Sequence, residues 1–278
     1  MSTFNFTIIP PPEALKRDIE CLRISTYRGY EPLDVKVCPK GFPGIVFQFA
    51  IDGSSAIDSI SVRTARIPNI PSFFLHGQGS EPSIMRFKNK PFTSIQVVLK
   101  PHALYSVFGW QANSLHGGFL PSDQFGASEL EKQLKSASSD EERTFYLCAF
   151  LTRKMEETNN RDEWIERILE FIRERVSSIT VKEIVAAFPI SERQLQKRFA
   201  RVVGMSPQLY IRIVRVNEAL RLMKSGGFER FVDIACALNY FDQSHFIRDI
   251  KAFSWVSPSS IRMKVSEFHN DEAGASYL

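Results

Sequence analysis

The pattern of apolar and polar positions changes near residue 100. Before it, short apolar or alternating runs are bounded by Gly, Pro, Asn or Ser, a pattern typical of antiparallel strands. In residues 44–52, for example, Ile45, Phe47 and Phe49 share one face and Val46 lies on the other. The remaining runs are 59–67, 72–77, 83–87 and 94–101. This half is therefore predicted to be a small sandwich or barrel of short strands.

Helical spacing begins after Pro101. The first helices are predicted over 102–108, 127–136 and 140–157, and Ser139 with Glu142 forms a predicted capping box for the last of them. Apolar residues then recur at helical spacing from Trp164 to Val176, which predicts a packing helix.

Capping residues delimit six further helices. Thr180 with Glu183 and Ser191 with Gln194 are predicted capping boxes, and Ser206 is a predicted N-cap followed by proline. Asp242 is a predicted N-cap as well. The predicted helices are 181–187, 192–202, 207–224 (ended by Ser225-Gly226-Gly227), 230–238, 243–253 and 258 to about 268, with a frayed tail over 270–278.

One stretch of the helical half occurs twice. Residues 184–207 correspond to residues 234–258, at an offset of 50 before a short turn and 51 after it. A loop tolerates one extra residue, whereas a helix does not. The repeat therefore predicts two helix-turn-helix units, each able to lay a helix in a DNA groove.

Each unit presents polar side chains on the outer face of its second helix. Leu195, Phe199 and Val202 face inward in the first unit, as do Phe246, Ile250 and Phe253 in the second. The predicted base-contacting residues are Arg193, Gln196 and Lys197 in the first unit and Gln243, Ser244 and Arg248 in the second. Arg or Lys can donate to guanine, and Gln can pair with adenine. The alternative is an ordinary solvated helix face, and the repeat favours DNA reading.

The charge distribution agrees with a nucleic-acid partner. Residues 176–264 hold 14 Lys and Arg against 7 Asp and Glu, a net charge of +7, while the remainder carries −3. No long uncharged apolar run predicts a transmembrane helix, and no signal peptide is apparent. Cys21, Cys38, Cys148 and Cys236 form no CxxC pair, so they are expected to be idle thiols in a reducing cytoplasm.

The strand-rich half suggests no chemistry. His76, His102 and His116 lack metal-ligand spacing and are expected to be structural or surface residues. No phosphate loop, GxGxxG, HExxH or GxSxG is present, so no catalytic residue, metal or cofactor is predicted. Five phenylalanines could line a pocket, although aromatic strand residues are more often core: Phe47, Phe49, Phe73, Phe74 and Phe87.

The C-terminal part resembles the AraC/XylS family of bacterial transcription regulators. The matching stretches are SERQLQKRF (191–199), GMSPQLY (204–210), Arg215 with Ala219, IACALNYFDQSHFIRDIK (234–251) and VSPSSIR (256–262). The resemblance implies two helix-turn-helix units joined by one long helix. The family usually has Gly at the positions of Pro189, Asn239 and Trp255, and Phe at that of Ile250. Pro189 and Trp255 are therefore expected to reshape a turn and a loop, and Asn239 to be left-handed.

The N-terminal half resembles the small β-rich domain that precedes this module in many relatives, on FLHGQ (74–78) and LKPHALYSVFG (99–109). In better-known relatives that domain binds an effector or dimerises.

Together these features predict an α+β protein: a small β-sandwich or barrel (cupin-like) domain over 1–135, a helical linker over 136–160 and the double helix-turn-helix over 161–270. The predicted function is sequence-specific DNA binding in transcription regulation, in the cytoplasm of a bacterium and without enzymatic activity. Expected partners are double-stranded DNA, a small-molecule effector at the N-terminal domain, a second copy of the chain and, for an activator, RNA polymerase, but no membrane. The alternative is a small-molecule-binding or enzymatic β-barrel whose helical part serves packing or oligomerisation.

Overall fold

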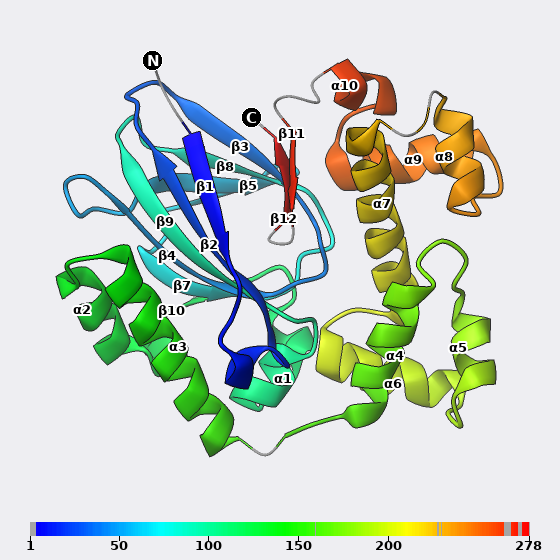
Figure 1. Ribbon diagram of the computed structural model, residues 1–278, viewed down its shortest axis with the longest axis horizontal. Coiled ribbons are helices and arrows are strands. Elements are labelled where there is room, and N and C mark those ends of the chain that lie inside the picture. The colour runs from blue at the N-terminus through cyan, green and yellow to red at the C-terminus, as the bar shows by residue number, and fades with distance from the viewer. Residues whose placement is uncertain are drawn as a thin grey trace.

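The computed structural model describes residues 4–158, 160–226, 228, 230–263, 268–271 and 274–277. A β-rich N-terminal region precedes a helical C-terminal region, so the α+β prediction is confirmed (Figure 1). The strands form two six-stranded antiparallel sheets, and two strands that follow the helices join the second sheet. In spatial order, the first sheet holds β1 (Phe4–Ile9), β2 (Ile19–Tyr27), β9 (Phe92–Leu99), β4 (Gly44–Ala50), β7 (Phe73–His76) and β10 (Phe119–Pro121). The second holds β11 (Phe268–Asp271), β12 (Gly274–Tyr277), β3 (Leu33–Cys38), β8 (Ser83–Phe87), β5 (Ile57–Val62) and β6 (Ala65–Pro68).

The inner strands of the first sheet bury both faces. Phe47 and Phe73 lie in an apolar cluster that includes residues of the covering helices, whereas Phe74 and Phe87 lie in the cluster between the two sheets. This division follows from the alternation of side chains along a strand. Phe49 packs partly buried against the first cluster. The phenylalanines are therefore core residues, as expected, although Phe74 also borders a cavity described below.

The run over 59–67 was predicted as one strand, and this is wrong. β5 and β6 form a hairpin whose turn contains Arg63 at φ 51°. Arg-Thr is not a strong hairpin signal, because the favoured turns place Asn or Gly where φ is positive.

Helices and 3₁₀ turns cover the first sheet. They are α1 (Ala103–Phe108), α2 (Ser128–Ser136) and α3 (Asp140–Glu157), with 3₁₀ turns η1 (Glu13–Leu15), η2 (Ala112–Leu115) and η3 (Ser122–Phe125). Ser139 caps α3 by accepting a hydrogen bond from the Glu142 amide, but the predicted capping box is not formed. The Glu142 carboxylate instead accepts hydrogen bonds from the amide and hydroxyl of Ser138.

The C-terminal helices begin and end close to the predicted positions. They are α4 (Glu163–Glu174), α5 (Val181–Ala187), α6 (Glu192–Val203), α7 (Pro207–Ser225), α8 (Phe231–Ala237), α9 (Gln243–Ser254) and α10 (Pro258–Met263). The capping boxes of Thr180 and Ser191 are present, and Ser206 and Asp242 are N-caps. Gly226 ends α7 in the left-handed conformation. Gly227 and the predicted last turns of the final helix, over 264–267, lie outside the described residues.

The frayed tail predicted over 270–278 is a further correction. β12 pairs with β3 of the N-terminal region, with Ser276 opposite Val37 and Tyr277 opposite Lys36. This pairing joins residues about 240 positions apart, and the sequence of the tail contains no local pattern that predicts a strand there.

The two helix-turn-helix units differ in their turns, as the sequence predicts. After α5 the backbone is extended at Phe188 (φ −123°, ψ 143°), which suits a residue before proline. After α8, Leu238 stays near the helical region and Asn239 is left-handed at φ 52°. The Tyr240 amide then donates to the Ala235 carbonyl at 2.9 Å. Trp255 is left-handed as well, at φ 58° at the end of α9.

The backbone at Asn239 predicts opposite effects for two substitutions. Asn239→Gly should be neutral or slightly stabilising, because glycine takes a left-handed conformation without steric penalty. Asn239→Val should lower the free energy of unfolding by about 1–2 kcal/mol through backbone strain. Urea denaturation of both variants beside the parent measures this difference, and equal stability of the two would contradict it.

Candidate nucleic-acid interface

The outer face of α6 carries the three residues predicted for the first unit. Arg193, Gln196 and Lys197 are exposed, while Leu195, Phe199 and Val202 are fully buried in the helical core. The capping box at Ser191 fixes where the helix begins, and its apolar stripe then fixes which side faces water.

The equivalent face of α9 is exposed in the same way. Gln243, Ser244 and Arg248 are solvent-exposed, and Phe246, Ile250 and Phe253 are buried. Ile247, which lies 51 positions after Gln196, is half-buried against the core. Each unit thus presents its polar set at the N-terminal half of its second helix.

These side chains are almost free of internal partners. Gln196 donates to Glu192 at 3.2 Å. For Arg193, Lys197, Gln243, Ser244 and Arg248 the described part of the chain offers no side-chain hydrogen bond or ion pair. Their donors are therefore available to an external acceptor.

Other basic residues of the C-terminal region have partners within the protein. Arg215 of α7 donates to the carbonyl oxygens of Val176 and Ile179, at 3.2 and 2.7 Å, and so fixes the segment between α4 and α5. Further paired basic residues are Arg198, Arg201, Arg212, Arg221 and Arg230. Sequence reasoning counted all of these as positive charge and did not separate the paired from the unpaired.

One position of the repeat makes an ion pair in both units with reversed polarity. In α6, Arg198 binds the buried carboxylate of Asp162, the N-cap of α4, at 2.6 and 2.9 Å. In α9, the residue 51 positions later is Asp249, whose buried carboxylate accepts from Arg212 of α7 at 2.7 Å. The first pair holds α6 to the start of α4, and the second holds α9 to the long helix α7. The repeat in the sequence does not reveal it, because the charges are exchanged.

The inner end of α6 rests on the N-terminal region. Gly204, left-handed at φ 89°, ends α6 so close to η2 that an added Cβ would lie 3.0 Å from the Ala112 carbonyl oxygen. The Arg201 guanidinium lies 5.2 Å from the centre of the Tyr105 ring of α1. The first unit is therefore docked on the β-rich region.

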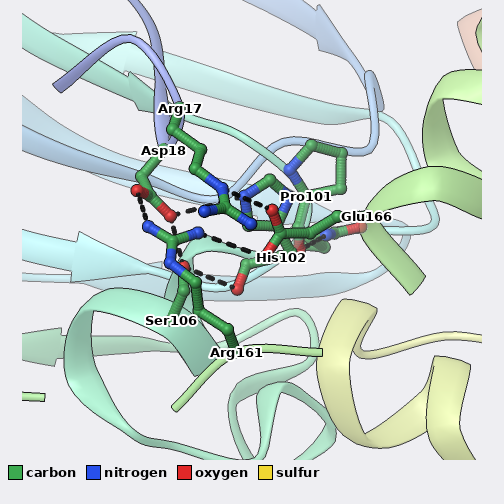
Figure 2. Close-up of polar contacts among 8 residues, drawn as sticks. Arg17, Asp18, Pro101, His102, Ser106, Arg161 and Glu166 are labelled. Atoms are coloured by element: carbon green, nitrogen blue, oxygen red, sulfur yellow. Dashed lines mark hydrogen bonds and ion pairs between the residues drawn. The ribbon is translucent and has the colours of Figure 1, made fainter. Parts of the chain in front are cut away.

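A polar cluster ties the segment before α4 to the same region (Figure 2). Arg161 binds the fully buried Asp18 at 2.5 Å and Glu166 of α4 at 3.1 Å. Asp18 also accepts from Ser106 of α1 at 2.5 Å, and the His102 ring lies 3.4 Å away. Burial alone would raise the pKa of Asp18, but contacts with His102, Arg161 and Ser106 outweigh it and hold the pKa well below its usual value. Arg17 belongs to the cluster as well and binds Glu166, 149 positions later, at 2.8 Å. Sequence analysis did not find this cluster, because its members are far apart along the chain.

Two cavities adjoin these elements. One, of about 420 Å³, opens into the β-rich region and is lined mainly by apolar residues together with His76, Gln96 and His116. Burial lowers the pKa of His76. The other, of about 810 Å³, lies between the two regions and is lined by residues that include Lys40, Phe42, Leu169 and Tyr210.

The other residues considered for chemistry are dispersed. The His76 Nδ1 faces the Gly77 carbonyl at 3.0 Å and the His116 Nε2 faces the Ser80 hydroxyl at 3.2 Å. Over the described residues, no three His, Cys, Asp or Glu side chains gather where a metal ion could bind. No helix within the same ranges is both long and apolar enough to cross a membrane.

Comparisons with known proteins cover the chain in two parts. Residues 184–264 match a family described as a helix-turn-helix domain, and residues 7–121 match one described as a domain of unknown function (DUF6597). The HTH-type transcriptional activator RhaS of Klebsiella pneumoniae (strain 342) is 30% identical over 109 residues, 38% of each chain. The uncharacterized HTH-type transcriptional regulator YidL of Escherichia coli (strain K12) is 32% identical over 94 residues, 34% of this chain and 31% of the relative. The match thus spans about a third of the length of these relatives.

Among solved structures, ToxT from Vibrio cholerae O395 is 14% identical and has a TM-score of 0.49, with 95% of this chain and 99% of the other covered.

The Asp18 cluster predicts a pH-dependent stability. Asp18→Asn should lower the free energy of unfolding at pH 7 by about 2–3 kcal/mol, because charge-assisted hydrogen bonds are lost. Since the pKa of Asp18 is lowered in the folded state, its contribution is present above the unfolded pKa of about 4 and is lost as pH falls further. The difference between parent and variant should therefore shrink below about pH 4. The exposed Asp123, substituted to Asn, is the control, and a difference that stays constant to pH 2 would contradict the prediction.

Proposed function

We propose that this protein, whose C-terminal part is a double helix-turn-helix domain of the AraC type, is a sequence-specific DNA-binding transcription regulator. One observation carries the proposal: two repeated helices, α6 and α9, present exposed polar side chains whose donors have almost no partner in the described structure. Lys197 and Arg248 occupy equivalent positions of the repeat and are both exposed, which favours an external acceptor for both helices.

The proposed mechanism is recognition of successive turns of the major groove by α6 and α9. Arg193, Gln196 and Lys197 would contact bases from the first helix, and Gln243, Ser244 and Arg248 from the second. Other basic residues would contact phosphates and fix the register of the protein on the duplex.

The connecting helix supports this spacing. α7 has 19 residues and so spans about 28 Å, while equivalent points of one groove face recur every ~34 Å. The ion pair of Arg198 with Asp162 holds α6 to α4, and that of Arg212 with Asp249 holds α9 to α7. Both reading helices are thus placed by rigid contacts before DNA arrives, which reduces the ordering that binding requires.

Control through the N-terminal region is the finer part of the proposal. The cavity of about 420 Å³ in the β-rich region has the size and apolar lining that suit a small-molecule effector. Because α6 docks on η2 and α1, a shift of that region would be transmitted to the first reading helix. A second copy of the chain is the other proposed partner of this region.

The names of the matched relatives indicate how the protein would regulate transcription. RhaS is named a transcriptional activator, and an activator of this kind would contact RNA polymerase. The named relatives are regulators rather than enzymes, and a regulator of bacterial genes would act in the cytoplasm. The rival function, a ligand-binding or enzymatic barrel, draws support only from the cavity in the β-rich region.

Substitution separates base reading from general attraction. Arg193→Ala or Arg248→Ala should weaken binding to the selected site by about 1–3 kcal/mol and relax preference at one or two base pairs. Lys132→Ala, at an exposed position on α2, is the control and should change neither. The measurement is a randomised-site selection for each variant, and unchanged preference in both arginine variants would show that these faces do not read bases.

The salt dependence of binding distinguishes DNA recognition from the rival function of a ligand-binding barrel. Binding of DNA should weaken steeply between 50 and 200 mM salt, because counterions are released from phosphates. Ligand binding in a largely apolar cavity should not follow that slope. Fluorescence anisotropy with labelled DNA fragments measures the slope, and a protein that binds no fragment of its own genome at low salt would contradict the proposed function.

A further inference from the structure

Phe241 is the most exposed of the large apolar side chains in the described structure, at 93% of its full accessible area. The others in this group are Tyr30, Ile51, Phe145 and Trp255, at 69%, 72%, 67% and 37%. A phenylalanine in this state adds nothing to the core and leaves a large apolar surface in water. Its position in the turn before α9 is therefore not explained by folding.

The repeat shows why this side chain is left outside. Ile190 and Tyr240 correspond at the offset of 50, and both are buried, at 9% and 8% exposure. Ser191 and Asp242 correspond at the offset of 51, and both are N-caps. Phe241 lies between Tyr240 and Asp242 and has no counterpart in the first unit. It is the one residue by which the second turn is longer.

The neighbouring contacts hold this arrangement. The Tyr240 ring packs edge-on against Phe246, with centroids 5.4 Å apart, and so occupies the inner side of the turn. Asn239, left-handed at φ 52°, turns the chain out of α8. The Asp242 carboxylate accepts from the His245 amide at 2.6 Å and starts α9 directly after Phe241. With both sides fixed, Phe241 is held at the N-terminal end of the second reading helix.

That end of the helix is where bases are contacted. In helix-turn-helix docking, the N-terminal residues of the second helix reach base edges in the major groove. Gln243 and Ser244, two and three residues after Phe241, are exposed and lack side-chain partners in the part of the chain described. An apolar ring beside them faces a surface on which thymine is the base that offers an apolar group, its 5-methyl.

We infer that Phe241 is a specificity-determining residue that contacts the 5-methyl group of a thymine in the half-site read by α9. The inference rests on the proposed function and adds to it a preference for one base, made by an apolar contact rather than by a hydrogen bond. The first unit, without the extra residue, makes no equivalent contact.

The test uses the full chain and a DNA site obtained by selection with the wild-type protein. Each thymine of that site is replaced in turn by deoxyuridine, which removes only the 5-methyl group. One replacement should weaken wild-type binding about fourfold, the effect of one methyl-sized group leaving an apolar contact. Phe241→Ala should bind the parent site more weakly and should show no further loss at that replacement.

Two controls make the result specific. Phe241→Leu keeps an apolar side chain and should retain part of the deoxyuridine effect. Phe145→Ala removes another exposed phenylalanine, on α3 far from α9 in Figure 1, and should leave the whole profile unchanged. Because Phe241 and Phe145 are both exposed, all three variants should keep the melting temperature of the parent.

The outcomes are distinguishable. If the wild-type protein selects no site, the proposed function fails. If it selects a site but no deoxyuridine replacement separates it from Phe241→Ala, the proposed function stands and the thymine contact is overturned. If Phe241→Ala binds every site like the parent but no longer supports transcription with RNA polymerase, Phe241 contacts a protein, which also overturns the inference.

Discussion

Two consecutive residues of opposite charge, Arg161 and Asp162, fix the relation between the halves of this molecule. Arg161 reaches back to the buried Asp18 of the β-rich region, and Asp162 reaches forward to Arg198 on the first reading helix. Asp162 also starts α4 by accepting from the Ile165 amide. The backbone between these two residues therefore links the N-terminal region to α6, which carries the proposed DNA-reading surface. Because a buried carboxylate without its partner is strongly unfavourable, neither contact is given up without loss of stability.

The charged residues of the helical region fall into two groups, those paired within the protein and those left exposed. The buried Asp162 and Asp249 each take an arginine, and these pairs set the orientation of α6 and α9. Arg193, Lys197 and Arg248 stay exposed and unpaired in the described structure. A net charge summed over the region mixes both groups. The part of the charge that can serve recognition is the part that no internal carboxylate or carbonyl neutralises.

The two units share a frame but not their details. The ion pair at the 198 and 249 positions exchanges its charges, and the first turn is extended before Pro189 where the second is left-handed at Asn239. Phe241 lengthens the second turn by one residue. The exposed faces of α6 and α9 thus belong to units with the same order of helices, but the two faces differ in shape and chemistry. Such a difference suits recognition of two unlike half-sites rather than of a repeated one.

The sequence alone determined the features that depend on local geometry. Capping at Thr180, Ser191 and Ser206, the buried stripes of α6 and α9 and the left-handed Asn239 all follow from side-chain chemistry within a few residues. The exposure of the six predicted base-contacting residues follows from those stripes, and their contacts with DNA stay a prediction. Only the tertiary structure decided what depends on distant neighbours: the Asp18 cluster, the pairing of β12 with β3, and which arginines are neutralised. The physical reason is that helical periodicity fixes which side of an element is buried, whereas the partner it is buried against is set by packing across the whole chain.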